Sequence, residues 1–595
     1  MGALAGLLKV AGHDVRGSDS HPYPPMSDQL RQLGVPIFEG FSADNLAWGP
    51  EQVVVGNVNR RDHVEVVAAT AAGIPLTSLP AALEQHFLQD RHNVVVTGTH
   101  GKTTTTALLA AVLVDAGLDP SFLIGGVPAN LGRGYRMGGG AHFLLEGDEY
   151  DSAFFDKESK FLHYRPRTAI LTSIELDHVD IFASLEDVKR AFVKFVALLP
   201  SDGLLVVAAS SAQARAVAAS ARCPVETYAA GRRGEGQVDW HGETLGTERG
   251  RTRFRVTHKG TEIGDFDVGL LGEHNVENAV AVVAVATRLG VSTPELARGL
   301  ARFRGVKRRQ ELRGVASGVE VIDDYGHHPT AVRETLAALR RPSGKLVALY
   351  EPRSATSRRS VFQTDFADAF ASADQVVVGK LFAPDGIPPD ERFDPEKLVS
   401  DLRARGVTAR YLPSVDEIAK QVAADASPGD RVVVFSSGEF GGLHEKLLDA
   451  LGDPMVPARP EDMPRVRAIL ELTGVGTKDA TDDRWPDVFL VRCDGEIVGS
   501  VMVESYDEAA VLRSLAVIPE RRGHGFGWML ADHAASRARD RGARRLYLLT
   551  ETASDFFGEK LGFRQIDRAT VDPAVAASPH FRESARSAVA MRLDL

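Results

Sequence analysis

The sequence predicts an α/β protein that ends in a smaller α+β unit. Up to about residue 452, short β-branched runs such as Val94–Val96 alternate with amphipathic stretches, which is typical of parallel sheets covered by helices. Beyond residue 458, two alternating apolar runs flank the turn Cys493-Asp-Gly-Glu496 and indicate an antiparallel hairpin. Between these parts, residues 453–459 contain two prolines, and we predict a linker. The predicted units span residues 1–88, 89–307, 308–452 and 458–595.

Composition and charge exclude several classes of protein. The chain has 595 residues, of which 44% are hydrophobic and 25% charged, as expected for a globular protein of several domains. A formal net charge of −11 argues against nucleic acid as a partner, since binding it needs a dominant basic face. No run approaches the roughly 18 apolar residues of a membrane helix, so we expect no membrane partner. The two cysteines, Cys223 and Cys493, are far apart and lack metal-type spacing, which fits a reducing cytoplasm.

The first unit begins inside a nucleotide-binding motif. Residues 3–11 are predicted to form a helix, and residues 14–17 a strand that ends at Ser18-Asp19. In a βαβ unit that binds a nucleotide, these would be the helix after the first strand and the second strand with its acidic tip. The first strand of this unit and most of its glycine loop are missing from the sequence. We therefore expect that the start codon is assigned too far downstream. A further strand, Val53–Val55, ends in a turn at Gly56-Asn57.

The second unit is organised around a glycine loop between a buried strand and a helix that begins near Lys102. Such a loop directs backbone N–H groups and the positive end of the helix at one point, which suits a triphosphate. Gly98 and Gly101 let the backbone approach the phosphates. Lys102 can neutralise their charge, and the Thr103 hydroxyl can bind Mg²⁺. The alternative is a simple glycine turn before a helix, and the strand–loop–helix context favours ATP.

Polar side chains follow the next strands of this unit. Glu146 ends the apolar run that begins at Phe143, and His178 follows the run Ala169–Ile174. Because ligands of open parallel sheets bind beyond the carboxyl ends of the strands, we predict that Glu146 and His178 face the phosphate loop as partners of Mg²⁺.

Later segments offer further contacts for a nucleotide. His274, Asn275 and Asn278 open an Ala/Val-rich helix and have the ring and amide groups that would hold an adenine, with helix capping as the alternative. The third unit again alternates strands and helices, and its strands end in the polar segments Asp323–Pro329, Glu351–Ser354 and Ser436–Gly442.

The fourth unit has its own glycine turn before a helix. The strand Val511–Ile518 is followed by Arg521-Arg-Gly-His-Gly-Phe-Gly527, and a helix extends from there to about Ala538. Backbone N–H groups at such a helix N-terminus form an anion site. Glu504 could act as a base, but we favour a solvent-exposed strand carboxylate.

Residues 1–452 resemble the Mur ligase family. The motifs that carry the resemblance are Thr97-Gly-Thr-His-Gly-Lys-Thr103, Asp177-His178, Gly272-Glu-His-Asn275 and Asp324-Tyr-Gly-His-His328. The resemblance implies a Rossmann-like N-terminal domain, a P-loop central domain and a Rossmann-like C-terminal domain. It assigns ATP binding to Gly98, Thr99, His100, Gly101, Lys102, Thr103, Thr104, His274, Asn275, Asn278, Asp324, Tyr325 and His328. It assigns catalysis to Lys102, Glu146, His178 and Arg309, the metal to Thr103, Glu146 and His178, and substrate binding to Ser18, Asp19, Gly56, Asn57, Glu351, Arg353 and Ser354.

The resemblance implies ligation of a carboxylate to an amine, driven by ATP. The carboxylate of UDP-N-acetylmuramate (UDP-MurNAc) would form an acyl phosphate, and the α-amine of the tripeptide L-Ala-γ-D-Glu-meso-diaminopimelate would displace the phosphate. Cations are needed around the transferring phosphoryl group, and Arg309 would arrive from the next domain on closure. The stretches that favour this tripeptide-adding branch are Asp148–Lys157, Glu351–Ser354 and Gly438–Gly442. The runner-up is the branch that adds L-alanine to UDP-MurNAc.

Two positions depart from the family pattern. Ser173 stands where the family usually has Asn before the Asp-His segment. Phe192 lies near the position where several relatives carry a carbamylated lysine. The missing first strand would have carried the loop that is expected to hold the UDP pyrophosphate.

Residues 458–595 resemble the GNAT N-acetyltransferases, and Leu548-Leu-Thr550 and Asp555–Phe563 resemble their arsenic-resistance-associated branch. The resemblance assigns acetyl-CoA binding to Leu515, Val517, Arg522, Gly523, His524, Gly525, Phe526 and Gly527. Phe557 occupies the position where many members place a general-acid Tyr. The acceptor would be an amine that the sequence does not identify.

We therefore expect a bifunctional enzyme, a ligase of peptidoglycan recycling fused to an acetyltransferase. One alternative is an acetyltransferase that carries an inactive ligase, and another is a non-catalytic sensor of ATP or of a UDP-sugar. The complete set of phosphoryl-transfer residues favours catalysis, since binding alone would not require it.

Overall fold

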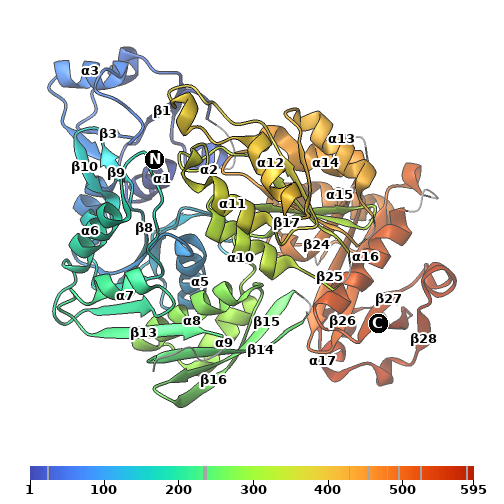
Figure 1. Cartoon of the computed structure of the whole chain (residues 1–595). Coiled ribbons are helices and arrows are strands. Elements are labelled where there is room, and N and C mark those ends of the chain that lie inside the picture. Colours follow the sequence, from blue (N-terminus) through green and yellow to red (C-terminus); the bar gives the residue numbers. More distant parts are fainter. Residues whose placement is uncertain are drawn as a thin grey trace. The chain divides into compact units, whose positions relative to one another are not determined.

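The predicted α/β architecture is confirmed in a computed structural model, which describes residues 1–595 except 23–25, 232–237, 249, 343, 428, 453–454, 479, 494–495, 523–525 and 585–586. The chain forms two compact units (Figure 1). Unit 1 comprises Met1–Gly246 and Thr252–Arg309, and unit 2 comprises Thr247–Arg251 and Gln310–Leu595.

Unit 1 contains a sheet in the strand order β16-β15-β14-β13-β12-β11-β5-β8-β6-β7. Its parallel centre is apolar on both faces, as expected for strands covered by helices on each side. The strands are β5 (His92–Thr97), β6 (Ser121–Leu123), β7 (Tyr135–Arg136), β8 (His142–Gly147), β11 (Thr168–Leu171), β12 (Leu204–Ala208), β13 (Val225–Ala230), β14 (Trp240–Glu248), β15 (Arg251–His258) and β16 (Thr261–Val268).

Helices cover both faces of this sheet. One core cluster packs one face under α5 (Lys102–Asp115), α8 (Glu273–Arg288) and α9 (Thr293–Arg302). The other face lies under α6 (Leu185–Val196) and α7 (Ala212–Ala218). The strand–loop–helix unit β5–α5 therefore has its loop at the carboxyl end of a central strand.

The first ninety residues add two short parallel strand pairs. The pairs are β1 (Gly17–Asp19) with β2 (Ile37–Glu39), and β3 (Val53–Val55) with β4 (Leu76–Ser78). The accompanying helices are α1 (Gly2–Val10), α2 (Met26–Gln32), α3 (Val64–Ala71) and α4 (Leu79–Leu83). The first strand begins at Gly17, so the strand predicted over residues 14–17 is displaced toward its acidic tip.

Unit 2 contains a sheet in the order β21-β20-β19-β22-β18-β17-β23-β24-β25-β26-β27-β29-β28. The half formed by residues 310–452 has parallel strands at its centre. Its strands are β17 (Glu311–Ala316), β18 (Val319–Asp324), β19 (Leu346–Tyr350), β20 (Gln375–Val378), β21 (Thr408–Tyr411) and β22 (Arg431–Phe435). Its helices are α10 (Pro329–Leu339), α11 (Gln363–Phe370), α12 (Pro395–Ala404), α13 (Val415–Asp425) and α14 (Leu443–Leu451).

The other half of this sheet is mostly antiparallel, which confirms the predicted change of character. The predicted hairpin is formed by β24 (Val488–Cys493) and β25 (Glu496–Tyr506), although Asp494 and Gly495 of its turn lie outside the described residues. The remaining strands are β26 (Ala509–Val517), β27 (Arg545–Thr550), β28 (Arg564–Ile566) and β29 (Val589–Asp594). The helices are α15 (Met463–Thr473), α16 (Phe526–Asp540), α17 (Pro573–Ala576) and α18 (Pro579–Glu583).

A short strand joins the two halves, where the sequence predicted a linker. Strand β23 (Met455–Pro457) pairs antiparallel with β17 at Val315 and with β24 over its whole length. Met455 is buried in the core under α16, and Val456 packs against the cores of both halves. The linker prediction is therefore wrong for residues 455–457, because two open strand edges are available to pair with them.

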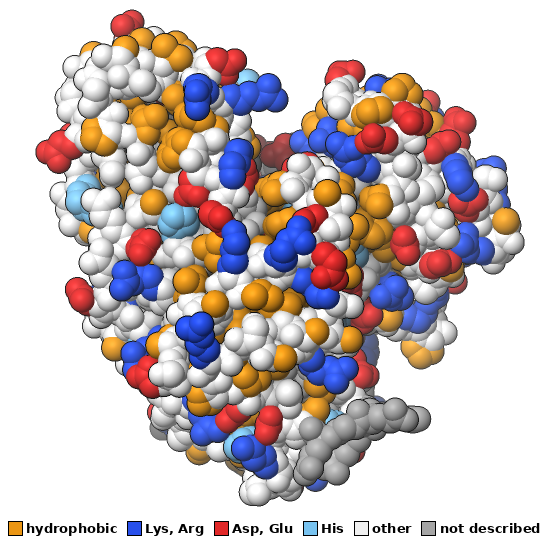
Figure 2. All heavy atoms as spheres, turned by 60° about the vertical axis from the view of Figure 1, so that its left-hand side comes forward, with side chains coloured by type: hydrophobic (Ala, Val, Ile, Leu, Met, Phe, Trp, Pro, Cys, Tyr) orange, Lys and Arg blue, Asp and Glu red, His pale blue; other side chains and the backbone are white. Residues whose placement is uncertain are grey.

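Among the described residues, no helix is long and apolar enough to cross a membrane. On the face shown in Figure 2, Lys and Arg side chains are interspersed with Asp and Glu side chains rather than gathered in a single patch.

Candidate functional site

The glycine loop is held at the carboxyl end of β5 by close backbone packing. A Cβ atom at Gly98, whose φ is 129°, would lie 2.2 Å from Thr172 Oγ1 and 2.7 Å from the backbone nitrogen of Ser173. A Cβ atom at Gly101, whose φ is 80°, would lie 2.7 Å from Asn278 Oδ1. Glycine is therefore required at both positions, and the start of α8 packs against the loop.

Lys102 is directed back over this loop. Its Nζ atom donates to Gly98 O at 2.7 Å and lies 2.8 and 3.0 Å from the two carboxylate oxygens of Glu149. Burial alone would lower the pKa of Lys102, but Glu149, Asp148 and Glu146 outweigh it and raise the pKa. The ammonium group is thus fixed as a cation where a triphosphate would need one.

Glu149 is a candidate site residue that the sequence analysis missed. It is 2% exposed and contacts both Lys102 and His178. Sequence reasoning selected Glu146 because it directly ends the apolar run. The signal that could have found Glu149 is the acidic cluster Glu146-Gly-Asp-Glu149, in which more than one carboxylate can reach the loop.

Glu146 contacts the hydroxyl group of Thr103 instead. Thr103 Oγ1 donates to Glu146 Oε1 at 2.7 Å, and Gly125 N donates to Glu146 Oε2 at 2.6 Å. Arg309 donates to Thr103 Oγ1 at 3.5 Å. Arg309 and Thr103 both belong to unit 1, so this contact lies within one unit. Delivery of Arg309 by domain closure stays a prediction.

His178 lies in a strained backbone conformation beside Glu149. Its φ is 52°, which is uncommon for a residue other than glycine. Its Nε2 atom lies 3.2 Å from Glu149 Oε1, and its ring lies 4.2 Å from the ring of Tyr150. Burial would lower the pKa of His178, but its contacts with Glu149 and the charge of Asp177 raise it.

The acidic cluster fits a divalent cation. Asp148, Glu149 and His178 offer ligand atoms that all lie within 4.8 Å of one another. Carboxylate and imidazole groups are ordinary ligands of such ions. Of the predicted metal set, the structure brings Thr103 and Glu146 together and places His178 on Glu149.

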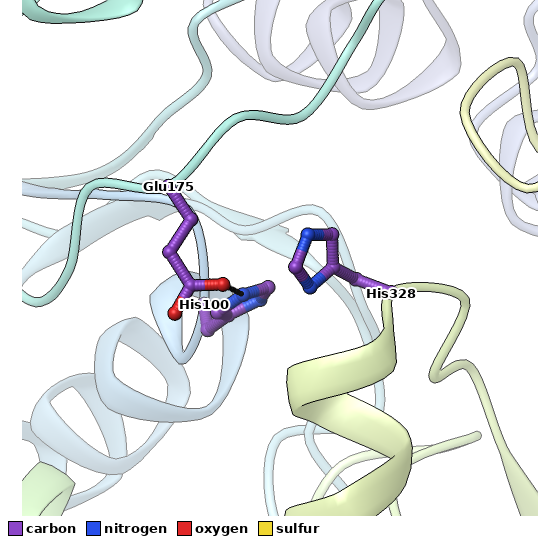
Figure 3. A group of neighbouring side chains, drawn as sticks. All are labelled: His100, Glu175 and His328. Carbon is purple, nitrogen blue, oxygen red and sulfur yellow. Dashed lines mark hydrogen bonds and ion pairs between the residues drawn. The ribbon is translucent and has the colours of Figure 1, made fainter. Parts of the chain in front are cut away.

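The residues after Gly98 are supported by the segment that follows β11. Thr99 N donates to Ser173 O at 2.8 Å, and His100 N donates to Ser173 Oγ at 3.0 Å. The ring of His100 lies against Glu175, with Nε2 3.2 Å from Oε2 (Figure 3). Ser173, which departs from the family pattern, therefore supports the loop. Thr104, a further predicted ATP contact, is buried on α5.

Phe192, near the position of the family's modified lysine, belongs to the core. It is fully buried, and its ring lies 5.2 Å from that of Phe161.

The segment predicted to hold an adenine lies at the start of α8. Burial, followed by the charge of His100, lowers the pKa of His274 to about 4, so its ring is neutral. Asn275 Nδ2 donates to Leu271 O at 2.8 Å, and Asn278 Nδ2 donates to Asn275 Oδ1 at 3.3 Å. Helix α8 begins after Gly272 with no side-chain cap, so the structure gives no support to helix capping as the role of these side chains.

The residues predicted to bind the UDP-sugar lie in β1 and directly after β3. Ser18 Oγ accepts a hydrogen bond from Asn45 Nδ2 at 3.2 Å, and Asp19 Oδ1 accepts one from His21 N at 3.0 Å. Gly56-Asn57 comes directly after β3.

In unit 2, the predicted nucleotide contacts lie between β18 and α10. Asp324 accepts hydrogen bonds from Gly326 N at 2.8 Å and from Gln310 N at 2.9 Å. The ring of Tyr325 packs against that of His327. His328 stands at the start of α10 (Figure 3) and accepts from Thr330 N at 3.3 Å.

Two of the stretches that favoured the tripeptide branch meet at the ends of β19 and β22. Ser436 Oγ donates to Glu351 Oε2, and Arg353 lies 3.6 Å from the other oxygen of Glu351. The Arg353 guanidinium lies 3.8 Å from the centre of the Phe382 ring and packs on Gly438, where an added Cβ would clash with it. Ser354 Oγ accepts from Ser357 N at 3.0 Å. Arg353 is thus a fixed, partly exposed cation beyond two strand ends.

The predicted acetyl-CoA site lies where the pairing between β26 and β27 ends. The two strands pair only from Ala509 to Val511, so among the described residues the later part of β26, with Leu515 and Val517, presents an edge that β27 does not cover. Arg522 Nε donates to Val517 O at 3.1 Å. Phe526 is buried at the start of α16, and Gly527 lies beside Phe556. The predicted residues Gly523, His524 and Gly525 lie outside the described residues.

The prediction that Glu504 is an exposed carboxylate is wrong. Glu504 is 5% exposed and accepts hydrogen bonds at 2.7 Å from Arg484, Arg513 and Tyr506. Arg484 comes from the loop before β24, a partner that strand alternation cannot reveal. Three donors occupy the carboxylate, which argues for an organising role rather than for a base.

Comparison with known families accounts for most of the chain. The Mur ligase family, catalytic domain, matches residues 1–91, the Mur ligase middle domain matches residues 96–286, and the Mur ligase, glutamate ligase domain, matches residues 308–438. The Acetyltransferase (GNAT) family matches residues 446–563.

Individual relatives show the same similarity. The UDP-N-acetylmuramate--L-alanyl-gamma-D-glutamyl-meso-2,6-diaminoheptandioate ligase of Escherichia coli (strain K12) is 38% identical, covering 76% of this chain and 96% of that protein. The UDP-N-acetylmuramate--L-alanine ligase of Agrobacterium fabrum is 35% identical, covering 74% of this chain and 92% of that protein. The crystal structure of a murein peptide ligase from Psychrobacter arcticus 273-4 superposes with a TM-score of 0.59 at 36% identity, covering 76% of this chain and 96% of that one.

Proposed function

The chain belongs to the Mur ligase family and carries a GNAT acetyltransferase domain, and on that basis we propose that it joins L-Ala-γ-D-Glu-meso-diaminopimelate to UDP-MurNAc. The family makes it an ATP-dependent amide ligase. We further propose the domains 1–88, 89–307, 308–452 and 458–595. The observation that carries the proposal is the group formed by Lys102, Glu149 and His178 at the glycine loop.

The chain's own residues would bind and neutralise the transferring phosphoryl group. Lys102 and the amides of the loop would hold the phosphates of ATP, and Arg309 lies close enough to Thr103 to add a second cation. Mg²⁺ held by the acidic cluster and Thr103 would neutralise further charge on the phosphates. His274, Asn275 and Asn278 would hold the adenine. The family resemblance assigns further nucleotide contacts to Asp324, Tyr325 and His328.

The choice of a tripeptide as the amine substrate is supported by unit 2. Arg353 is held by Phe382 and Gly438, both outside its own segment, and a fixed guanidinium can bind a peptide carboxylate in a bidentate way. Glu351 and Ser354 would complete this contact. The similar proteins from Escherichia coli and Haemophilus influenzae, which are 38% and 36% identical to this chain, are both named as ligases of this tripeptide.

Phosphate release tests the proposal. With ATP, Mg²⁺ and UDP-MurNAc present, we expect release to require the tripeptide and to vanish in Lys102→Ala. Release with L-alanine instead of the tripeptide would identify the second candidate, UDP-MurNAc–L-alanine ligase, which is supported by relatives of 35% identity. No release with either amine would favour an acetyltransferase with an inactive ligase.

For the C-terminal domain we propose acetyl transfer from acetyl-CoA to an amine, within the arsenic-resistance-associated branch. The uncovered edge of β26 offers backbone groups to an extended ligand, and Arg522 lies where this edge ends. We expect Arg522→Ala to weaken binding of acetyl-CoA at least about ten-fold, measured by calorimetry, since it removes a charge-assisted contact with phosphate.

A further inference from the structure

A hairpin beside the acidic cluster carries a lysine that none of the assigned roles uses. Strands β9 (Asp151–Ala153) and β10 (Asp156–Ser159) lead into a short helix, η3 (Lys160–His163). Lys160 N donates to Tyr150 O at 2.9 Å, and Phe161 N donates to Asp148 O at 3.3 Å. Phe161 is fully buried. The backbone of Lys160 is therefore fixed against the cluster.

The side chain of Lys160 reaches into the cluster. Its Nζ atom lies 2.6 Å from Asp148 Oδ2 and 5.7 Å from the centre of the Tyr150 ring. The side chain is 19% exposed, so the ammonium group is neither fully buried nor free in solvent. An ammonium group has three N–H donors, and it can hold Asp148 and a second acceptor at the same time.

The amino terminus connects Lys160 with the predicted UDP-sugar residues. Burial and then the charge of Lys160 lower the pKa of the Met1 amino group, while Asp19 raises it, so Lys160 and Asp19 are both near Met1. The Met1 side chain would lie 3.7 Å from a Cβ atom at Gly56. Lys102, in contrast, is bound to the phosphate loop.

The cluster has three carboxylates, more than the proposed Mg²⁺ would neutralise, so a further cation at this place is favourable. A carboxylate that attacks the γ-phosphate must approach Glu146, Asp148 and Glu149, all of which repel it. Lys102 is held by Glu149 and the loop, and it would be occupied by the phosphates. Lys160 contacts a different carboxylate of the cluster, Asp148.

We propose that Lys160 binds the carboxylate of UDP-MurNAc and holds it beside the phosphate loop for attack on ATP. The inference rests on the proposed function and adds the residue that recognises the charged group of the sugar. The same hairpin provides a matched control: Lys157 pairs with Asp151 at 2.6 Å and is 69% exposed.

Binding of paired ligands to the full chain tests this role. Dissociation constants of UDP-MurNAc and of UDP-GlcNAc, which lacks the lactyl carboxylate, are measured by calorimetry without ATP. For Lys160→Met we expect UDP-MurNAc to bind about ten- to a hundred-fold more weakly, as for a lost hydrogen bond between charged groups. Binding of UDP-GlcNAc should change less than about two-fold, and Lys160→Arg should restore most of the lost affinity.

The controls separate this role from a structural one. Lys157→Met should leave both ligands unaffected. If Lys160→Met does not fold, Lys160→Gln is measured in the same way, since it keeps a donor for Asp148. Equal weakening of both ligands, or no weakening of either, would overturn the inference while leaving the ligase reaction in place. A wild-type chain that binds no UDP-MurNAc would overturn the proposed function and the inference with it.

Discussion

Lys102 and Glu149 form an ion pair at 2.8 Å inside the glycine loop, and both side chains are almost fully buried, at 13% and 3% exposed. Glu149 also lies 3.2 Å from His178, so one carboxylate connects Lys102 to a candidate metal ligand. A buried carboxylate between two cationic groups is costly to desolvate, and a role in a reaction explains its presence better than stability does.

Removing the charge of Glu149 should abolish most of the ligase activity. Glu149→Gln keeps the shape but no longer orients Lys102 or contributes a charged ligand, so we expect phosphate release to fall at least about a hundred-fold. Glu158→Gln is the control, because Glu158 is 56% exposed and pairs with Lys194 on the surface. An unchanged rate in Glu149→Gln would exclude Glu149 from the reaction.

The stability that His178 contributes should depend on pH. Its pKa is raised in the folded protein, so its contribution is complete below the ordinary imidazole value of about 6.5 and is lost as the pH rises through the raised value. The difference in melting temperature between wild type and His178→Gln, measured with a chelator present, should therefore shrink from about pH 6 to about pH 9. A difference in melting temperature that grows over this pH range would contradict a raised pKa for His178.

Two glycines of the same conformation at the two ends of α5 should respond differently to alanine. Gly101 and Gly117 have φ values of 80° and 77°, but only at Gly101 would a Cβ atom meet another residue, Asn278. Each Gly→Ala change should cost about 1–2 kcal/mol of unfolding free energy from backbone strain. Only Gly101→Ala should also lose ATP binding, measured by calorimetry. Loss of ATP binding in Gly117→Ala would show that the loop geometry is not the cause.

The two halves of the sheet in unit 2 should open together when β23 is disrupted. Met455→Asp places a charge in a buried position next to β17 and β24, at a cost of about 3–5 kcal/mol. Limited proteolysis of the full chain should then produce new cuts both in residues 310–452 and in residues 458–595.

Leu472→Asp, at a position that is 59% exposed on α15, is the control for this change and should produce no new cuts. New cuts confined to residues 458–595 would mean that β23 belongs to the acetyltransferase domain alone.

Glu504 should matter for folding rather than for proton transfer. Glu504→Gln leaves Arg484 and Arg513 without their shared carboxylate, and we expect a loss of about 3 kcal/mol of unfolding free energy in urea. Glu508→Gln, on an exposed residue paired with Arg544, should be neutral. A folded, fully stable Glu504→Gln that no longer transfers acetyl groups would instead identify Glu504 as a base.

Local patterns were sufficient to predict the glycine loop and the elements around it. Val94–Val96 and the apolar stretch after Lys102 predicted a strand and a helix, and the structure contains β5 and α5 at these places. The helix is not amphipathic as predicted, because α5 is buried on all sides from Thr103 to Leu113. The carboxylate facing Lys102 could not be predicted in this way. Glu146 is the penultimate residue of β8, and Glu149 comes two residues after the end of that strand. The path of the chain after Gly147 decides which of them reaches the lysine.

Long-range packing decided the remaining differences. Residues 455–457 are a strand because the edges of β17 and β24 lie on either side of them, and these edges come from distant parts of the sequence. The burial of Glu504 likewise depends on Arg484, twenty residues earlier.

We propose above all that Lys102 and its partners catalyse ATP-driven joining of the tripeptide to UDP-MurNAc. Release of phosphate from ATP with both substrates present is the most direct test. We predict release that requires UDP-MurNAc and L-Ala-γ-D-Glu-meso-diaminopimelate together and that is absent in Lys102→Ala. Release that continues without the tripeptide, or that persists in Lys102→Ala, would contradict it.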